Sequence, residues 1–288
     1  MKKIVSLFLV LIILISGSGC RNDSNMENIN IYTTAYPIEY VVNRLYGDHS
    51  TIRSIYPNGI SIENYKVTDV LLSEYSNTDM FIFNGLSEEK DYVKPMQKEN
   101  KNLKIIDVSA DITYKHGIEE LWLNPSRLLT IANNIKKGFN EYISAKYLKD
   151  EIDNNYKNLK VDLTNLEAKY RKVIKNASNL NIVVSDDLFL FLENYGVNVI
   201  SLDKNNSDYD KNLSNVKNLI NNNSIKYIYL PDDEKNDTID YLIENTSITK
   251  ISLNTLSTLT DEQRNNYDYL TLMTENLELL KKQLYNLD

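Results

Sequence analysis

The sequence predicts an α/β fold of two similar lobes with mainly parallel sheets, joined by one long rigid helix, with a ligand cleft between the lobes. Two observations predict this class. Short β-type runs alternate with helical stretches in both halves of the chain, which indicates βαβ units. Between the halves, an apolar stripe of helical period continues without Gly or Pro. We therefore expect an N-terminal lobe at 29–142, a linker helix at 143–178 and a C-terminal lobe at 179–288.

The start of the chain has the composition of a secretory leader. An apolar run from Ile4 to Ile15, followed by small residues, leads to Cys20, the only cysteine in the sequence. The run is too short for a membrane-spanning helix, which needs about 20 apolar residues. We expect a lipoprotein signal peptide at 1–19, lipidation of Cys20 and a flexible tether at 20–28. The alternative is an ordinary cleaved signal with an incidental cysteine.

Each element of the first half follows from its local pattern. Short β-type runs predict strands at Ile29–Thr33, Ile52–Tyr56, Asp79–Phe83 and Leu103–Asp107. Helical stretches between and after them predict helices at Pro37–Tyr46, Val67–Ser76, Glu88–Gln97 and Pro125–Phe139. The alternation of the two kinds of element favours a parallel sheet in this half.

The middle of the chain carries the helical stripe. Its apolar members are Leu148, Ile152, Tyr156, Leu159, Leu163, Leu166, Tyr170 and Val173. They recur at steps of three and four residues, as one face of a continuous helix requires. The part from Asp150 to Asn176 alone would span about 40 Å at 1.5 Å per residue. This segment is either a coiled coil or a rigid strut between two lobes.

The second half repeats the alternation. Strands are expected at Asn181–Ser185, Val197–Leu202, Lys226–Leu230 and Thr249–Leu253. Helices are expected at Leu188–Tyr195, Asn212–Asn221, Asn236–Asn245 and Asp261–Tyr285. Two such lobes would place a cleft between the carboxyl ends of their sheets, where open α/β folds bind ligands.

Charge and motifs exclude several functional classes. The formal net charge is -8, which argues against nucleic acid as a partner because phosphate binding needs clustered Lys and Arg. An acidic chain is compatible with cations. The sequence has no Gly-rich phosphate loop, no nucleophile elbow and no Cys/His pair, so we do not expect an enzyme. We expect a monomer.

Several short segments follow one another in a specific order and spacing. They include Thr34–Ile38, Pro57–Gly59, Asp79–Gly85, Trp122–Pro125, Tyr195–Gly196 and Asn276–Leu277. Together they resemble the metal-binding lipoprotein receptors of zinc/manganese-type ABC transporters, over nearly all of the mature chain. The resemblance implies two α/β lobes bridged by a long helix, with the metal held between the lobes. It also implies a lipid anchor on the bacterial membrane and an ABC permease as partner.

The resemblance implies four ligand positions, and this chain departs from the family at all of them. The family's ligands there are histidine, histidine, His or Glu, and Asp. The residues at the matched positions are Glu63, Glu120, Ser185 and Asn254, with Asp186, Asp187, Asp232 and His116 as alternates. The four replacements all offer oxygen, and oxygen donors suit Mn²⁺, Mg²⁺ and Ca²⁺ better than zinc. The expected cargo is a metal cation: Mn, Fe or Zn.

The candidate ligands also fit ordinary structural roles that involve no metal. Glu63 and Glu120 fit solvated loop positions, since most carboxylates are exposed. Asp186 or Asp187 could cap the helix that follows, a frequent role for Asp. Asn254 could be a turn residue after a strand.

Two functions fit these observations. The first is an extracytoplasmic solute-binding lipoprotein of an ABC importer, which binds a metal cation between its lobes and delivers it to the permease. The second is a surface interaction or adhesion lipoprotein on the same scaffold, which has lost transition-metal binding or binds another ligand. The missing histidines keep the second function open.

Overall fold

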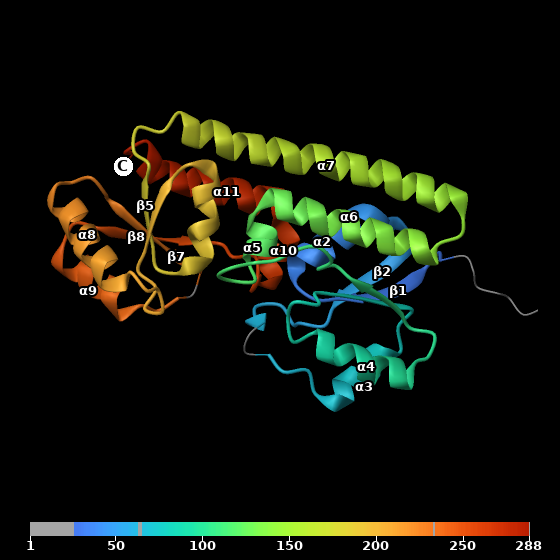
Figure 1. Ribbon diagram of the computed structural model, residues 1–288. Coiled ribbons are helices and arrows are strands. Elements are labelled where there is room, and N and C mark those ends of the chain that lie inside the picture. The colour runs from blue at the N-terminus through green and yellow to red at the C-terminus, as the bar shows by residue number, and fades with distance from the viewer. Residues whose placement is uncertain (1–25, 63–64, 233, 288) are drawn as a thin grey trace, which may run out of the picture.

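Two α/β lobes lie next to each other, and one long helix runs along both of them (Figure 1). The computed structural model describes residues 26–62, 65–232 and 234–287. Cys20 and the predicted signal peptide lie outside the described residues. Among the helices that are described, none is long and apolar enough to cross a membrane.

The first lobe is built on a parallel sheet of order β2-β1-β3-β4. Its strands are β1 (Ile29–Thr33), β2 (Ser50–Ser54), β3 (Met80–Phe83) and β4 (Lys104–Asp107). Its helices are α2 (Tyr36–Tyr46), η1 (Gly47–His49), α3 (Asp69–Ser76), α4 (Lys90–Glu99), α5 (Glu120–Leu123) and α6 (Pro125–Tyr142).

Strand β3 shows why this lobe has three layers. Alternate side chains of a strand point to opposite faces of the sheet. Met80 and Ile82 pack in the core that contains α2 and α6, whereas Phe81 and Phe83 pack in the core that contains α3 and α4. All four side chains are therefore buried, as in a central strand covered on both faces.

The second lobe repeats the strand order, with a parallel sheet β6-β5-β7-β8. Its strands are β5 (Asn181–Val184), β6 (Asn198–Ser201), β7 (Tyr227–Pro231) and β8 (Thr249–Leu253). Its helices are η3 (Asp187–Tyr195), α8 (Tyr209–Asn221), α9 (Asp237–Asn245), α10 (Asp261–Asn266) and α11 (Tyr269–Leu284).

Helix α7 (Lys146–Lys175) is the predicted linker and acts as a strut, not as a coiled coil. It packs against α2 and α6 of the first lobe and against η3 and α11 of the second. At about 1.5 Å per residue its 30 residues span about 45 Å. Six of the eight predicted stripe residues are buried, whereas Tyr156 and Val173 are only partly buried and Ile174 is buried as well. One hydrophobic core runs from the first lobe through this helix into the second.

Several predicted elements differ from the structure in their bounds, and three differ in kind or position. The single helix expected over Asp261–Tyr285 is two helices, because the backbone is extended at Tyr267 and Asp268 and the Asp268 carboxylate caps the second one. The segment Leu188–Tyr195 is a 3₁₀-helix. Strand β2 ends at Ser54, and the N–H of Tyr56 bonds instead to the Ser54 hydroxyl.

Candidate metal centre

The cleft predicted between the lobes is present. It has a volume of about 750 Å³ and lies where the carboxyl ends of the two sheets approach each other. Its acidic lining residues are Glu119, Asp186, Asp203, Asp232 and Glu234. The other described lining residues are small, apolar, hydroxyl-bearing or His116, and none of them is Lys or Arg. The cleft therefore favours positively charged ligands.

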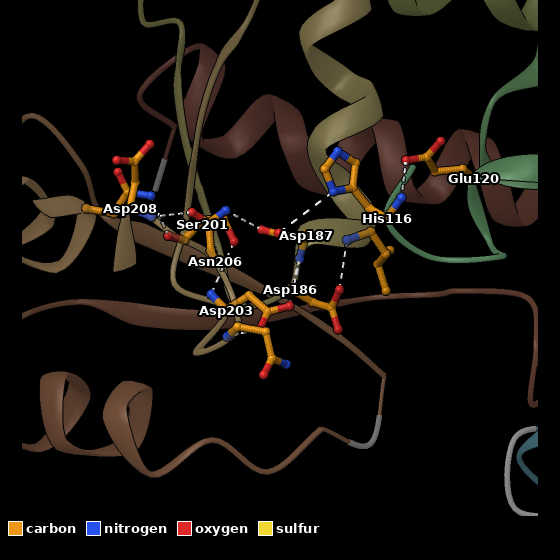
Figure 2. A network of polar contacts seen from close by, with 11 residues as sticks. His116, Glu120, Asp186, Asp187, Ser201, Asp203, Asn206 and Asp208 are labelled. Carbon is orange, nitrogen blue, oxygen red and sulfur yellow. Dashed lines mark hydrogen bonds and ion pairs between the residues drawn. The ribbon is translucent and has the colours of Figure 1, made fainter. Parts of the chain in front are cut away.

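Glu120 is turned away from this cleft. It opens the short helix α5 and is only 2% exposed. One carboxylate oxygen lies 3.5 Å from Nη2 of Arg127, and the other accepts the backbone N–H of His116 at 3.3 Å. Figure 2 shows Glu120 on the far side of His116 from the acidic residues of the second lobe. The carboxylate has an internal positive partner, and in this geometry it stabilises the loop before α5.

Trp122 fixes the same loop to the second lobe. It is the only tryptophan of the chain and is 1% exposed. Its indole Nε1–H donates to the carbonyl of Thr255 at 2.8 Å, and its own carbonyl accepts from the Tyr269 hydroxyl at 2.7 Å. Both partners belong to the C-terminal half, so these two hydrogen bonds join the first lobe to the second at this side of the cleft.

Ser185 and Asp186 follow the carboxyl end of β5. The Ser185 hydroxyl donates to the carboxylate of Glu234, which comes from the loop after β7. The Asp186 carboxylate accepts the N–H of Leu188 at 2.7 Å and so caps the 3₁₀-helix. Burial raises the pKa of Asp186, and the nearby negative charges of Asp203 and Glu234 raise it further. A bound cation would relieve this repulsion.

Asp187 and His116 connect the two lobes at the edge of the cleft. Nδ1 of His116 lies 3.7 Å from the Asp187 carboxylate, whose other oxygen accepts from Nδ2 of Asn206 at 2.7 Å (Figure 2). The backbone N–H of Asp187 points to Asp203 at 3.5 Å. His116, one of the predicted alternate ligands, is therefore beside the acidic residues.

Asn254 and Asp232 have local backbone partners. The Asn254 side chain accepts the N–H of Leu256 at 2.7 Å, the geometry of a turn after β8. Its backbone is paired with the amide of Asn276 at 2.8 and 2.7 Å. The Asp232 carboxylate accepts the N–H of Thr255 at 2.9 Å and also lines the cleft. Of these two, Asp232 is thus the one with access to a ligand.

The predicted site residues separate into three groups. Asp186, Asp232 and His116 line the cleft, with Ser185 and Asp187 bonded beside it. Glu120 and Asn254 have internal partners. Glu63 lies outside the described residues. Within the part of the chain that the structure describes, no group of three His, Cys, Asp or Glu side chains is arranged to hold a metal ion.

Three acidic residues of the cleft, Glu119, Asp203 and Glu234, were missed as ligand candidates. Asp203 follows β6 by two residues, and Glu234 lies in the loop after β7. Both come soon after the carboxyl end of a parallel strand, and such ends meet at one edge of a sheet. A search for acidic residues just after each predicted strand of the second lobe would have identified Asp203 and Glu234.

The chain matches known proteins along most of its length. Residues 31–283 match the family described as "ZnuA: Zinc-uptake complex component A periplasmic". The zinc-binding lipoprotein AdcA of Streptococcus pneumoniae R6 is 22% identical over 98% of this chain, which spans only 61% of AdcA. The high-affinity zinc uptake system protein ZnuA of Bacillus subtilis is 21% identical over 98% of both chains.

Solved structures show the same fold. The Zn(II)-bound ZnuA-like domain of Streptococcus pneumoniae AdcA has a TM-score of 0.73 and 20% identity, covering 89% of this chain and 99% of that domain. The metal-dependent lipoprotein YcdH of Bacillus subtilis has a TM-score of 0.74 at 20% identity, with coverage of 89% and 99%. The two-lobed architecture with a long connecting helix is therefore shared.

Proposed function

We propose that this chain, which belongs to the ZnuA family of zinc-uptake components, is the solute-binding lipoprotein of an ABC importer for a metal cation. It would be lipid-anchored at Cys20 on the outer side of the bacterial cell membrane, bind the cation between its lobes and deliver it to a permease. The names of relatives support a metal cargo, since AdcA is named for zinc and a further relative, PsaA of Streptococcus pneumoniae, for manganese. No enzymatic step is part of this proposal.

The acidic cleft is the observation that carries the proposal. Five carboxylates line it without a Lys or Arg among the described lining residues, and burial raises the pKa of one of them, Asp186. An excess of buried negative charge is unfavourable in the empty protein and is relieved when a cation binds. The donor atoms are oxygens, apart from the ring nitrogen of His116. A donor set that is mainly oxygen favours Mn²⁺ or an iron ion over zinc.

The proposed ligands come mainly from the second lobe. They are Asp186, Asp232 and Glu63, with Ser185, Asp187 and His116 as neighbours that position or complete the site. Glu120 and Asn254 are not part of the proposed coordination, because each already has an internal partner.

Calorimetric titration with Mn²⁺, Zn²⁺, Fe²⁺ and Fe³⁺, together with metal analysis of the purified protein, tests this function. Asp186→Asn and Glu63→Gln should each lower the affinity at least tenfold, as expected for loss of one charged ligand at about 1.4 kcal/mol or more. Glu244→Gln, an exposed carboxylate on α9, is the matched control and should change nothing. Equal affinities in all variants would contradict the site, and no binding of any of the four ions would contradict the cargo.

The second candidate remains a surface interaction lipoprotein on the same scaffold. It is favoured by the lack of a three-ligand group among the described residues and by the internal partners of Glu120 and Asn254. The laminin-binding protein Lbp of Streptococcus pyogenes has the same fold, with a TM-score of 0.70 at 18% identity. A protein that binds none of the tested ions but retains its fold would support this candidate over the first.

A further inference from the structure

Glu89 is a buried acidic residue that takes no part in the cleft lining. It precedes α4 and is 3% exposed. One carboxyl oxygen accepts from the Tyr56 hydroxyl at 3.1 Å, and the other accepts the backbone N–H of Asn84 at 2.9 Å. The fully buried Thr34 hydroxyl adds a favourable interaction with the carboxyl without forming a well-aligned hydrogen bond. The carboxyl thus joins the ends of β1 and β3 to the chain that follows β2.

The segment held by Glu89 is a wall of the cleft. It runs from Tyr56 to Ile62, and Gly59, Ser61 and Ile62 line the cleft. The segment also touches the C-terminal half, because the N–H of Gly59 donates to the Leu259 carbonyl at 2.9 Å. We call residues 56–62 the wall segment. Its first residue is fixed by Glu89, and its middle is fixed by the other half of the molecule.

Among the described residues, the ionisable side chains that interact with Glu89 are tyrosines. Tyr56 of the wall segment and Tyr92 of α4 both interact electrostatically with it, whereas Glu88, its neighbour in the chain, is exposed to solvent. Tyr65 packs edge-on against the Tyr56 ring, with ring centres 5.9 Å apart. Burial raises the pKa of Glu89 from its ordinary value of 4.5 to about 7, although its hydrogen bonds act in the opposite direction.

We propose that Glu89 is a proton-linked anchor of the wall segment: proton uptake by its carboxyl fastens residues 56–62 to the first lobe, and proton release loosens them. The reason is linkage. Any opening that exposes this carboxyl to water returns its pKa to the ordinary value of 4.5. Opening therefore releases a proton in this pH range, and it is favoured as the pH rises. Between the buried and the exposed titration ranges, the opening equilibrium shifts up to tenfold per pH unit, or a few hundred-fold in total.

The behaviour of the wall segment does not depend on the cargo, whereas its consequence for cargo rests on the proposed function. If a cation is bound in the cleft, tightening of this wall at lower pH slows its exchange with solvent. Failure of cation binding would leave the anchor itself intact, so the two proposals are tested separately.

Hydrogen exchange of the metal-free mature protein tests the anchor between pH 5.5 and 8, after correction for the intrinsic exchange rate. In the wild type, protection of the wall segment should fall as the pH rises. Glu89→Gln carries a neutral side chain at every pH, so its protection should not vary with pH. Glu88→Gln, an exposed neighbour, is the matched control and should follow the wild type. Equal pH dependence in wild type and Glu89→Gln, or protection that rises with pH, would overturn the proposal.

A second measurement covers the case in which Glu89→Gln does not fold. Carbon-13 NMR of the glutamate carboxyls in the wild type should show one group titrating near pH 7. Tyr56→Phe removes a hydrogen bond to the ionised form and should move this midpoint upward. A midpoint for Glu89 below pH 5 would overturn the anchor.

Discussion

The two lobes have the same strand order and treat their acidic residues differently. In the first lobe, the Glu120 carboxylate lies beside Arg127, and the Glu89 carboxyl is enclosed by hydrogen-bond donors. In the second lobe, Asp186, Asp203 and Glu234 gather at the carboxyl edge of the sheet and line the cleft, where they repel one another. Topology brings acidic residues of both lobes to the cleft, and four of the five acids that line it belong to the second lobe.

A residue at a position matched to the family therefore need not have the family's role. Glu120 and Asp186 both lie near expected ligand positions. A buried carboxylate is stable only with a charge partner or with enough donors. Glu120 has that partner in Arg127, so the first lobe uses this acid to fix a loop, whereas the second lobe lines the cleft with its acids.

Separating Glu120 from Arg127 should have a large effect on stability. Arg127→Met leaves Glu120 buried beside no cation and removes a hydrogen bond from Arg127 to the Thr113 carbonyl. We expect a loss of about 2 to 3 kcal/mol in the free energy of unfolding, in the lower range for a broken buried pair, because Arg127 is partly exposed. Chemical denaturation with fluorescence of the single residue Trp122 would measure it.

The double variant Glu120→Gln/Arg127→Met tests whether the loss of stability in Arg127→Met comes from the ion pair with Glu120. Glu120→Gln removes the charge, so Arg127→Met should cost less in that background than in the wild type. Arg53→Met, an exposed arginine on β2, is the control and should change the free energy of unfolding by less than about 0.5 kcal/mol. Additive effects of the two substitutions would show that Glu120 does not depend on Arg127.

The pH dependence of stability should be similarly large for Glu89. Burial raises the pKa of Glu89 from 4.5 to about 7, so the folded protein keeps a proton that the unfolded chain has lost. The stabilisation is complete below pH 4.5 and is lost as the pH rises through 7, by about 3 kcal/mol. Denaturation of wild type and Glu89→Gln from pH 4 to pH 8 should show that this component disappears in the variant. A parallel pH dependence in both proteins would contradict the assignment.

Neutralising Asp186 should have a smaller effect of the opposite sign. Asn is as good a helix cap as Asp, so Asp186→Asn retains the hydrogen bond from Leu188 and removes charge repulsion with Asp203 and Glu234. We expect the metal-free protein to gain about 0.5 to 1 kcal/mol at pH 8, and less at pH 5. Thermal unfolding at the two pH values would measure it. A loss of stability would contradict the repulsion and would mean that the folded protein stabilises the negative charge of Asp186.

Much of the architecture was accessible from the sequence. Strand β1 and strand β8 have the predicted bounds, and the stripe from Leu148 to Tyr170 is the buried face of α7. Such patterns are local: burial on one face of an element requires a fixed spacing along the chain. The break at Asp268 was missed because the apolar spacing continues across it, while the helix cap depends on one hydrogen bond.

The candidate site was accessible only in part. Asp186, Asp232 and His116 were named as alternate ligands from the sequence, and all three line the cleft. It could not show that Arg127 lies beside Glu120, or that the Asn254 side chain bonds to the N–H of Leu256. Side-chain direction depends on contacts between elements, and spacing along the chain does not specify them.

Two α/β lobes, the long connecting helix and an acidic composition compatible with cations follow from the sequence, because periodicity and composition are properties of the chain. Which acids lie at the cleft and which have internal partners depends on the tertiary structure. A carboxylate has the same charge in either lobe, but its role depends on burial and on the partner that folding brings to it: Arg127 for Glu120, Tyr56 for Glu89, and other carboxylates for Asp186.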